Sequence, residues 1–178
     1  MHRGVVVKSV VVQSGLKVRI LGLDPGLRHT GWGVIEAHGN RLSYIADGVV
    51  HPNPDLSLAE RLQALFLEVQ GLVATYAPDE CAIEDTFVSK NPSSTLKLGH
   101  ARAAAMLAPA VAGIRVSEYT PNLVKKSVVG AGHADKNQVA AMMRMLLPGS
   151  DAKKDAADAL AVAVCHAHHR TSVWRVAK

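Results

Sequence analysis

The chain contains the short apolar segment Val18-Arg-Ile-Leu-Gly-Leu-Asp-Pro-Gly26, which stops at an acidic residue followed by a turn. Val, Ile and Leu favour a buried strand, proline cannot donate to a sheet ladder, and glycine allows a sharp bend. Further strands are expected at residues 30–36 and 41–50, with a hairpin turn at residues 37–40. Three strands joined by such short turns predict an antiparallel meander.

The rest of the chain, after the third strand, is expected to form helices and two more strands. Short strands are expected at residues 81–83 and 114–119. The expected helices cover residues 58–73, 93–112, a short piece after Pro121, 136–147 and 155–168. Ser57 or Asp55 would cap the first helix, and Ser93 or Ser94 the second. This order predicts an α/β fold, a five-stranded mixed sheet flanked by helices on both faces.

The composition indicates one domain. Of the 178 residues, 48% are hydrophobic, which suffices for one sizeable core. We expect an N-terminal extension outside the fold at residues 1–16, the domain at residues 17–170 and a short tail at residues 171–178. The net charge of +5 suits a polyanionic partner such as nucleic acid, although many basic proteins bind none.

The cysteines and the apolar pattern point to the cytoplasm. Cys81 and Cys165 each lie in an apolar run, which favours two reduced, buried thiols over a bridge or a metal pair. No apolar stretch approaches the roughly 20 residues of a membrane helix. A cytoplasmic protein with no membrane partner is therefore expected.

Four carboxylates stand where they can meet. Asp24 and Glu84 each end a predicted strand, and Asp155 and Asp158 share one helical face through their i,i+3 spacing. Mg²⁺ and Mn²⁺ prefer carboxylate oxygens, and two such ions about 3.5–4 Å apart are one solution for phosphodiester hydrolysis. Taken singly, each acid has a plainer interpretation as a turn, a solvated side chain or a helix cap.

Five motifs in the same order resemble the RuvC family of bacterial Holliday junction resolvases, from about Val18 to His168. They are Leu21-Gly-Leu-Asp-Pro-Gly26 with Thr30-Gly-Trp-Gly33, Ala82-Ile-Glu-Asp-Thr-Phe-Val-Ser-Lys-Asn91, Leu96-Lys-Leu-Gly-His-Ala-Arg102, Val128-Val-Gly-Ala-Gly132 with Asp135-Lys136, and Asp155-Ala-Ala-Asp-Ala-Leu-Ala161. Some family members carry His at the position of Asp155, and the aspartate here keeps the metal interpretation intact.

The resemblance implies an RNase H-like fold and a homodimer. It implies an endonuclease that resolves four-way junctions by paired symmetric nicks in DNA recombination and repair, with two Mg²⁺ or Mn²⁺ ions per subunit. Asp24, Glu84, Asp155 and Asp158 would be the catalytic and metal-binding acids, and Lys136 a basic catalytic residue beside them. A branch-migration complex of RuvA and RuvB is the implied partner.

Several further residues are expected to hold DNA. Phe87 could stack on an unpaired base or be a core residue, and the resemblance favours the junction contact. The other candidates are Ser89, Lys90 and Asn91 beside it, Lys97 and Arg102 on the alanine-rich helix, and Lys125 and Lys136 around the glycine turn. His166, His168 and His169 look like a metal cluster, but a solvated or phosphate-facing helix end is the preferred interpretation.

Two rival functions remain. Actin-like sugar kinases and ATPases also open with a strand, an aspartate and a glycine turn, but they need two related domains and this chain is short for that. A module that binds junctions without cutting them would share the fold, and four intact acids argue against it.

Overall fold

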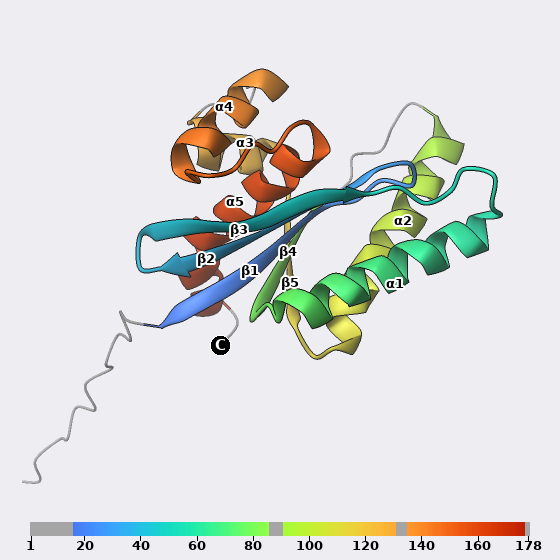
Figure 1. Ribbon diagram of the computed structural model, residues 1–178, viewed down its shortest axis with the longest axis horizontal. Coiled ribbons are helices and arrows are strands. Elements are labelled where there is room, and N and C mark those ends of the chain that lie inside the picture. The colour runs from blue at the N-terminus through green and yellow to red at the C-terminus, as the bar shows by residue number, and fades with distance from the viewer. Residues whose placement is uncertain (1–15, 86–90, 131–134, 177–178) are drawn as a thin grey trace, which may run out of the picture.

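The computed structural model describes residues 16–85, 91–130 and 135–176, with side chains to residue 170. A five-stranded sheet of order β3-β2-β1-β4-β5 forms its centre (Figure 1). The elements in chain order are β1 (Lys17–Asp24), β2 (Thr30–His38), β3 (Arg41–Val50), α1 (Leu58–Tyr76), β4 (Glu80–Glu84), α2 (Pro92–Val111), β5 (Arg115–Tyr119), α3 (Pro121–Val129), α4 (Lys136–Leu146) and α5 (Asp155–Val176). The predicted five-stranded sheet is confirmed.

The pairing of the central strand positions the first two acids. β1 runs antiparallel to β2 and parallel to β4, with Leu23 opposite Ile83. Because parallel strands end at the same edge of a sheet, the next residues on β1 and β4, Asp24 and Glu84, end side by side. The mixed sheet follows from the short hairpins before α1 and the helical crossovers after it.

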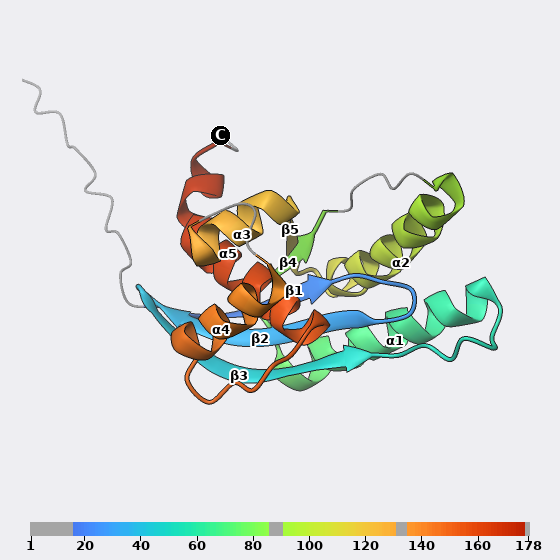
Figure 2. The same cartoon turned by 90° about the horizontal axis from the view of Figure 1, so that it is seen from above.

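Helices cover both faces of the sheet. In both views α1 and α2 lie together on one face, and α5 lies on the other with α3 and α4 packed against it (Figures 1 and 2). Two apolar clusters fill these layers. One gathers around α5 and the other beneath α1 and α2. None of the helices in the described ranges has the length and apolar character of a membrane-spanning segment.

The helix caps agree with the prediction in one case and differ in the other. Ser57 caps α1 in a reciprocal capping box with Glu60. For α2 the prediction of Ser93 or Ser94 was wrong, since Asn91 is the cap and its side-chain oxygen accepts the backbone N–H groups of both serines. Pro92 occupies the first helical turn, where no backbone donor is needed, so the helix begins before either serine.

Glycines bring α5 unusually close to the sheet. A β-carbon at Gly22 would lie 2.2 Å from the carbonyl oxygen of Ala159, and one at Gly31 would lie 1.9 Å from that of Asp155. At Gly33 a β-carbon would meet the side chain of Leu160 at 2.6 Å. Because these glycines have no side chain, the first half of α5 can pack directly against the backbone of β1 and β2.

A buried polar network fastens the second half of α5. His166 is 3% exposed, and its ring lies 2.7 Å from Glu80 at the start of β4 and 2.8 Å from the hydroxyl of Tyr119. Arg170 donates two hydrogen bonds to the same Glu80 carboxylate, at 2.8 and 3.0 Å. The preferred prediction of a solvated or phosphate-facing helix end is therefore wrong for His166, because Glu80, 86 positions away, accepts a hydrogen bond from its ring.

The other two histidines differ from it. His168 is exposed, as expected, and His169 is half-buried near the carbonyl of Cys165. Helix α5 also continues to Val176, past the expected end at residue 168, so residues 171–176 extend the helix. Cys81 and Cys165 are both free and buried, as predicted.

Replacing Glu80 by glutamine should destabilise the fold by about 2 kcal/mol at neutral pH, because Arg170 and His166 lose their charged partner. Burial raises the pKa of Glu80, but the hydrogen bonds from His166 and Arg170 outweigh it and lower the pKa to about 2. A lowered carboxyl pKa gives stability that is present above the unfolded value and lost as pH falls through the folded one. The free energy of unfolding of the wild type should thus fall between pH 4.5 and 2 more steeply than that of Glu80→Gln.

Urea unfolding at a series of pH values measures this difference. Glu68→Gln, an exposed change on α1, is the control and should leave the pH profile unaltered. Equal profiles for wild type and Glu80→Gln would contradict the role given to the network.

Candidate active site

Three carboxylates from two elements form a compact cluster. Asp24 at the end of β1 and Asp155 and Asp158 on the first turn of α5 each offer an oxygen within 4.8 Å of the others. The close approach of α5 at Gly31 makes this possible, because Gly31 pairs with Asp24 across the β1–β2 ladder and touches the backbone of Asp155. All three side chains are partly buried.

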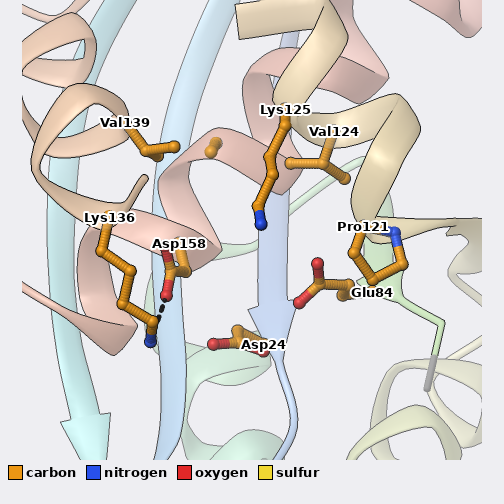
Figure 3. A pocket seen from close by; sticks show the side chains of 9 residues that line it. Asp24, Glu84, Pro121, Val124, Lys125, Lys136, Val139 and Asp158 are labelled. Carbon is orange, nitrogen blue, oxygen red and sulfur yellow. Dashed lines mark ion pairs between the residues drawn. The ribbon is translucent and has the colours of Figure 1, made fainter. Parts of the chain in front are cut away.

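Glu84 joins the cluster from the other side of Asp24 (Figure 3). A side-chain hydrogen bond links the two carboxyls. Burial, the negative charge of Glu84 and this hydrogen bond raise the pKa of Asp24 to about 9. Burial also raises the pKa of Glu84, although the side-chain hydrogen bond with Asp24 opposes that rise. The two carboxyls therefore share a hydrogen bond, and the pair holds a proton above the usual pH range of a carboxyl.

Two lysines line a cavity of about 250 Å³ together with three of the acids. Lys136 lies at the start of α4, and its ammonium is 3.0 Å from Asp158 and 3.8 Å from Asp155. The hydrogen bond to Asp158 raises the pKa of Lys136, so this side chain stays charged. Lys125 on α3 lines the same cavity (Figure 3).

The chemistry of this donor set fits divalent cations. All four side chains offer carboxylate oxygens, which are the ligands that Mg²⁺ and Mn²⁺ prefer. Four such groups in a partly buried site repel one another, and burial together with this repulsion raises the pKa of Asp24. A bound cation would relieve the repulsion and would release the proton of Asp24.

In the absence of metal, Asp24→Asn should be more stable than the wild type at pH 8, by about 1 to 3 kcal/mol. The folded pKa of Asp24, about 9, exceeds the unfolded value, so the folded state holds this proton more tightly. Rising pH therefore costs the wild type stability between about pH 4 and 9, while the asparagine variant has no such group.

Urea unfolding in the presence of a chelator, at pH 5 and pH 8, measures the change. Added Mn²⁺ should then stabilise the wild type and leave the variant less affected. A wild type that is more stable than the variant at pH 8 without metal would contradict this description of the acids.

The remaining predicted DNA contacts are scattered around the site. Phe87, Ser89 and Lys90 lie outside the described residues. Asn91 is the cap of α2, and exposed Lys97 lines a second cavity together with Asp155. Arg102 donates to the carbonyl of Glu84 at 3.2 Å, and its guanidinium also pairs with Asp85 and Glu118, so it fastens the end of β4.

Three residues that shape this region were not among the site residues predicted from the sequence. Arg28 and Arg61 line the second cavity, and buried Thr30 exchanges hydrogen bonds with Gly26 across the β1–β2 loop. Arg28 follows the Asp-Pro-Gly turn by two positions, which is a local signal for a nearby charge. No local feature of the sequence identifies Arg61, because it contacts the loop only when the folded chain brings α1 beside it.

Comparisons with known proteins agree with this geometry. The sequence profile of the family described as "Crossover junction endodeoxyribonuclease RuvC" matches residues 20–166. The protein of that description from Maricaulis maris is 64% identical over 155 residues, covering 87% of this chain and 93% of that protein.

Solved structures give the same result. The structure described as "T. thermophilus RuvC in complex with Holliday junction substrate" superposes with a TM-score of 0.80 at 31% identity, covering 87% of this chain and 96% of that one. The structure "Thermus thermophilus RuvC structure" gives a TM-score of 0.77 at the same identity and coverage. The RNase H-like fold implied by the resemblance is thereby confirmed.

Proposed function

Because this chain belongs to the RuvC family of crossover junction endodeoxyribonucleases, we propose that it resolves Holliday junctions by paired symmetric nicks made at the four-carboxylate site. The protein is a nuclease of the hydrolase class and a Holliday junction resolvase.

The convergence of Asp24, Glu84 and the two acids of α5 carries this proposal. Three elements far apart in the sequence place their acids together in one partly buried site. The electrostatic repulsion between these acids destabilises the fold, so their convergence points to a function rather than to stability. Such a cluster beside a lysine-lined cavity suits the hydrolysis of a polyanion.

Two Mg²⁺ or Mn²⁺ ions would be held by these acids. Asp24 lies between Glu84 on one side and the α5 pair on the other (Figure 3), so its carboxylate would hold metal together with both. When bound, such ions activate a water molecule and stabilise the leaving oxygen of the phosphodiester. Asp24 would release its proton to solvent when they bind, and β1, β4 and α5 would orient the four carboxylates.

Lys136 and Lys125 would hold the substrate phosphate. The ammonium of Lys136 already lies within 4 Å of both α5 acids, so a phosphate placed at the cluster would have that charge beside it. Lys125 approaches from α3 on the Glu84 side of the cavity (Figure 3). Two positive charges on different helices would restrict both the position and the orientation of the phosphate.

Paired nicks need two such sites, and a homodimer would supply them. Apolar side chains for a dimer contact are present on α2, where Leu96, Leu107 and Val111 are each more than half exposed. Leu107 and Val111 are i,i+4 neighbours, and Leu96 lies about three turns before Leu107 on the same face of the helix. A RuvA–RuvB partner stays a prediction from the family resemblance.

A nuclease assay on a four-way junction and on a linear duplex of the same sequence tests the proposed function. With Mg²⁺ or Mn²⁺ we expect nicks in two opposed strands of the junction, and roughly a hundredfold less cutting of the duplex or of either substrate under chelation. Junction binding without nicking in every metal would identify a non-cleaving binding module and would contradict the proposal.

A further inference from the structure

A second cavity adjoins the acidic cluster from the side of α1 and α2. Its volume is about 520 Å³, and its walls come from the β1–β2 loop, the first turns of α1 and α2, and Asp155. Both views bring that loop close to the beginnings of the two helices (Figures 1 and 2). This cavity is separate from the one lined by Lys125 and Lys136. Asp155 lines the second cavity, whereas Asp24 and Asp158 line the first.

The charge of this cavity is positive. Arg28 comes from the loop, Arg61 from α1 and Lys97 from α2, while Asp155 is the only acid among its described lining residues. Like charges drawn from three elements into one hollow are unfavourable unless an anion joins them. Arg28, His29 and Arg61 also line a neighbouring hollow of about 330 Å³, so the basic surface continues towards His51.

Arg61 is held in place and keeps unused hydrogen-bonding capacity. Its Nη2 donates to the carbonyl oxygen of Leu27 at 2.9 Å, which fixes the guanidinium against the loop. Its buried Nε has no acceptor among the described residues. Guanidinium groups match phosphate oxygens in paired hydrogen bonds, and buried polar atoms in native proteins usually find a partner.

The acids therefore lie between two basic cavities. Lys125 and Lys136 line one, and Arg28, Arg61 and Lys97 line the other. Resting on the proposed function, we propose that the second cavity binds the backbone phosphate next to the scissile one, on the side away from Lys136. The cut strand then crosses the cluster with a neutralised phosphate on each side, which fixes the position of the scissile bond over the acids.

A thermodynamic cycle between protein and DNA charges tests this assignment. Single phosphates of the cut strand are replaced in turn by uncharged methylphosphonates, and junction binding is measured without divalent ions, so that the strand stays intact. For the wild type, one substitution adjacent to the scissile position should weaken binding about fivefold. In Arg28→Gln/Lys97→Gln the same substitution should cost less than about twofold, while all other positions behave as in the wild type.

Salt dependence gives a second measure. The double variant should reduce the slope of log affinity against log salt by about 1 to 2, because one or two phosphate contacts are lost. Arg41→Gln/Lys126→Gln removes the same two charges from exposed positions outside the cavity, and it should leave the methylphosphonate pattern unchanged. Arg61 is left intact because it also holds the loop.

Equal losses at every phosphate in wild type and double variant would overturn the assignment, and so would the same loss of coupling in the control. Failure of nicking is a separate result. A protein that shows the coupling but does not nick would keep the phosphate cavity and lose the proposed catalytic site. A protein that nicks without the coupling would lose the cavity alone.

Discussion

Asp24→Asn is expected to abolish junction nicking while junction binding persists. Asparagine keeps the size of the side chain but loses the carboxylate that lies between Glu84 and the α5 acids. Because this carboxylate would hold metal together with its neighbours, its loss removes a ligand from the centre of the site, and the nicking rate should fall roughly a thousandfold or more. Nicking under single-turnover conditions and binding by fluorescence anisotropy, on the same junction, separate the two effects.

The matched control is Asp151→Asn. Asp151 has a highly exposed side chain paired with Lys153, and it lies four residues before Asp155 without joining the cluster. This variant should nick at the wild-type rate. Nicking by Asp24→Asn within tenfold of the wild-type rate would show that the metal assignment of Asp24 is wrong, whatever its effect on stability.

Gly31→Ala should both destabilise the protein and damage the acidic site. The new methyl group would lie 1.9 Å from the carbonyl oxygen of Asp155, and a helix backbone cannot turn aside as a flexible side chain can. We expect a loss of about 3 kcal/mol in the free energy of unfolding, at the upper end of overpacking effects. The first turn of α5 must also lift away from β2, which separates Asp155 from Asp24.

Urea unfolding measures the first effect, and Mn²⁺ binding by calorimetry measures the second. Gly71→Ala serves as the control, because a β-carbon there meets nothing within 4 Å and the residue lies inside α1. That change should stabilise the fold by about 0.5 to 1 kcal/mol. A Gly31→Ala protein with unchanged stability and metal affinity would mean that α5 does not need the close approach.

The order of strands and helices was largely predictable from local pattern. Apolar segments of strand length, Pro-Gly turns and helical spacing each act over a few residues, and these gave all five strands and the positions of the helices. The convergence of Asp24 and Glu84 could also be predicted, because a meander followed by a helical crossover allows β4 to pair with β1. The acids of α5 shared a face by spacing alone.

Features that depend on partners far away in the sequence were not predictable in this way. His166 looked like part of a solvated helix end, yet Glu80, 86 positions before it, makes it a buried hydrogen-bonding residue. Arg61 reaches the cavity beside the acids only because α1 packs against the β1–β2 loop. Such contacts are decided by how helices cross the sheet, which no local window contains.

The bare backbone of β2 beneath α5 has a consequence for recognising active nucleases in sequence collections. A chain could keep all four acids and still be inactive if a bulkier residue stood where Gly31 stands, because its last helix would be held too far out. Screens for functional resolvases, or designs that transplant this site into another scaffold, should therefore require the small residues under the helix as strictly as the carboxylates. A search based on the four acids alone would include inactive proteins.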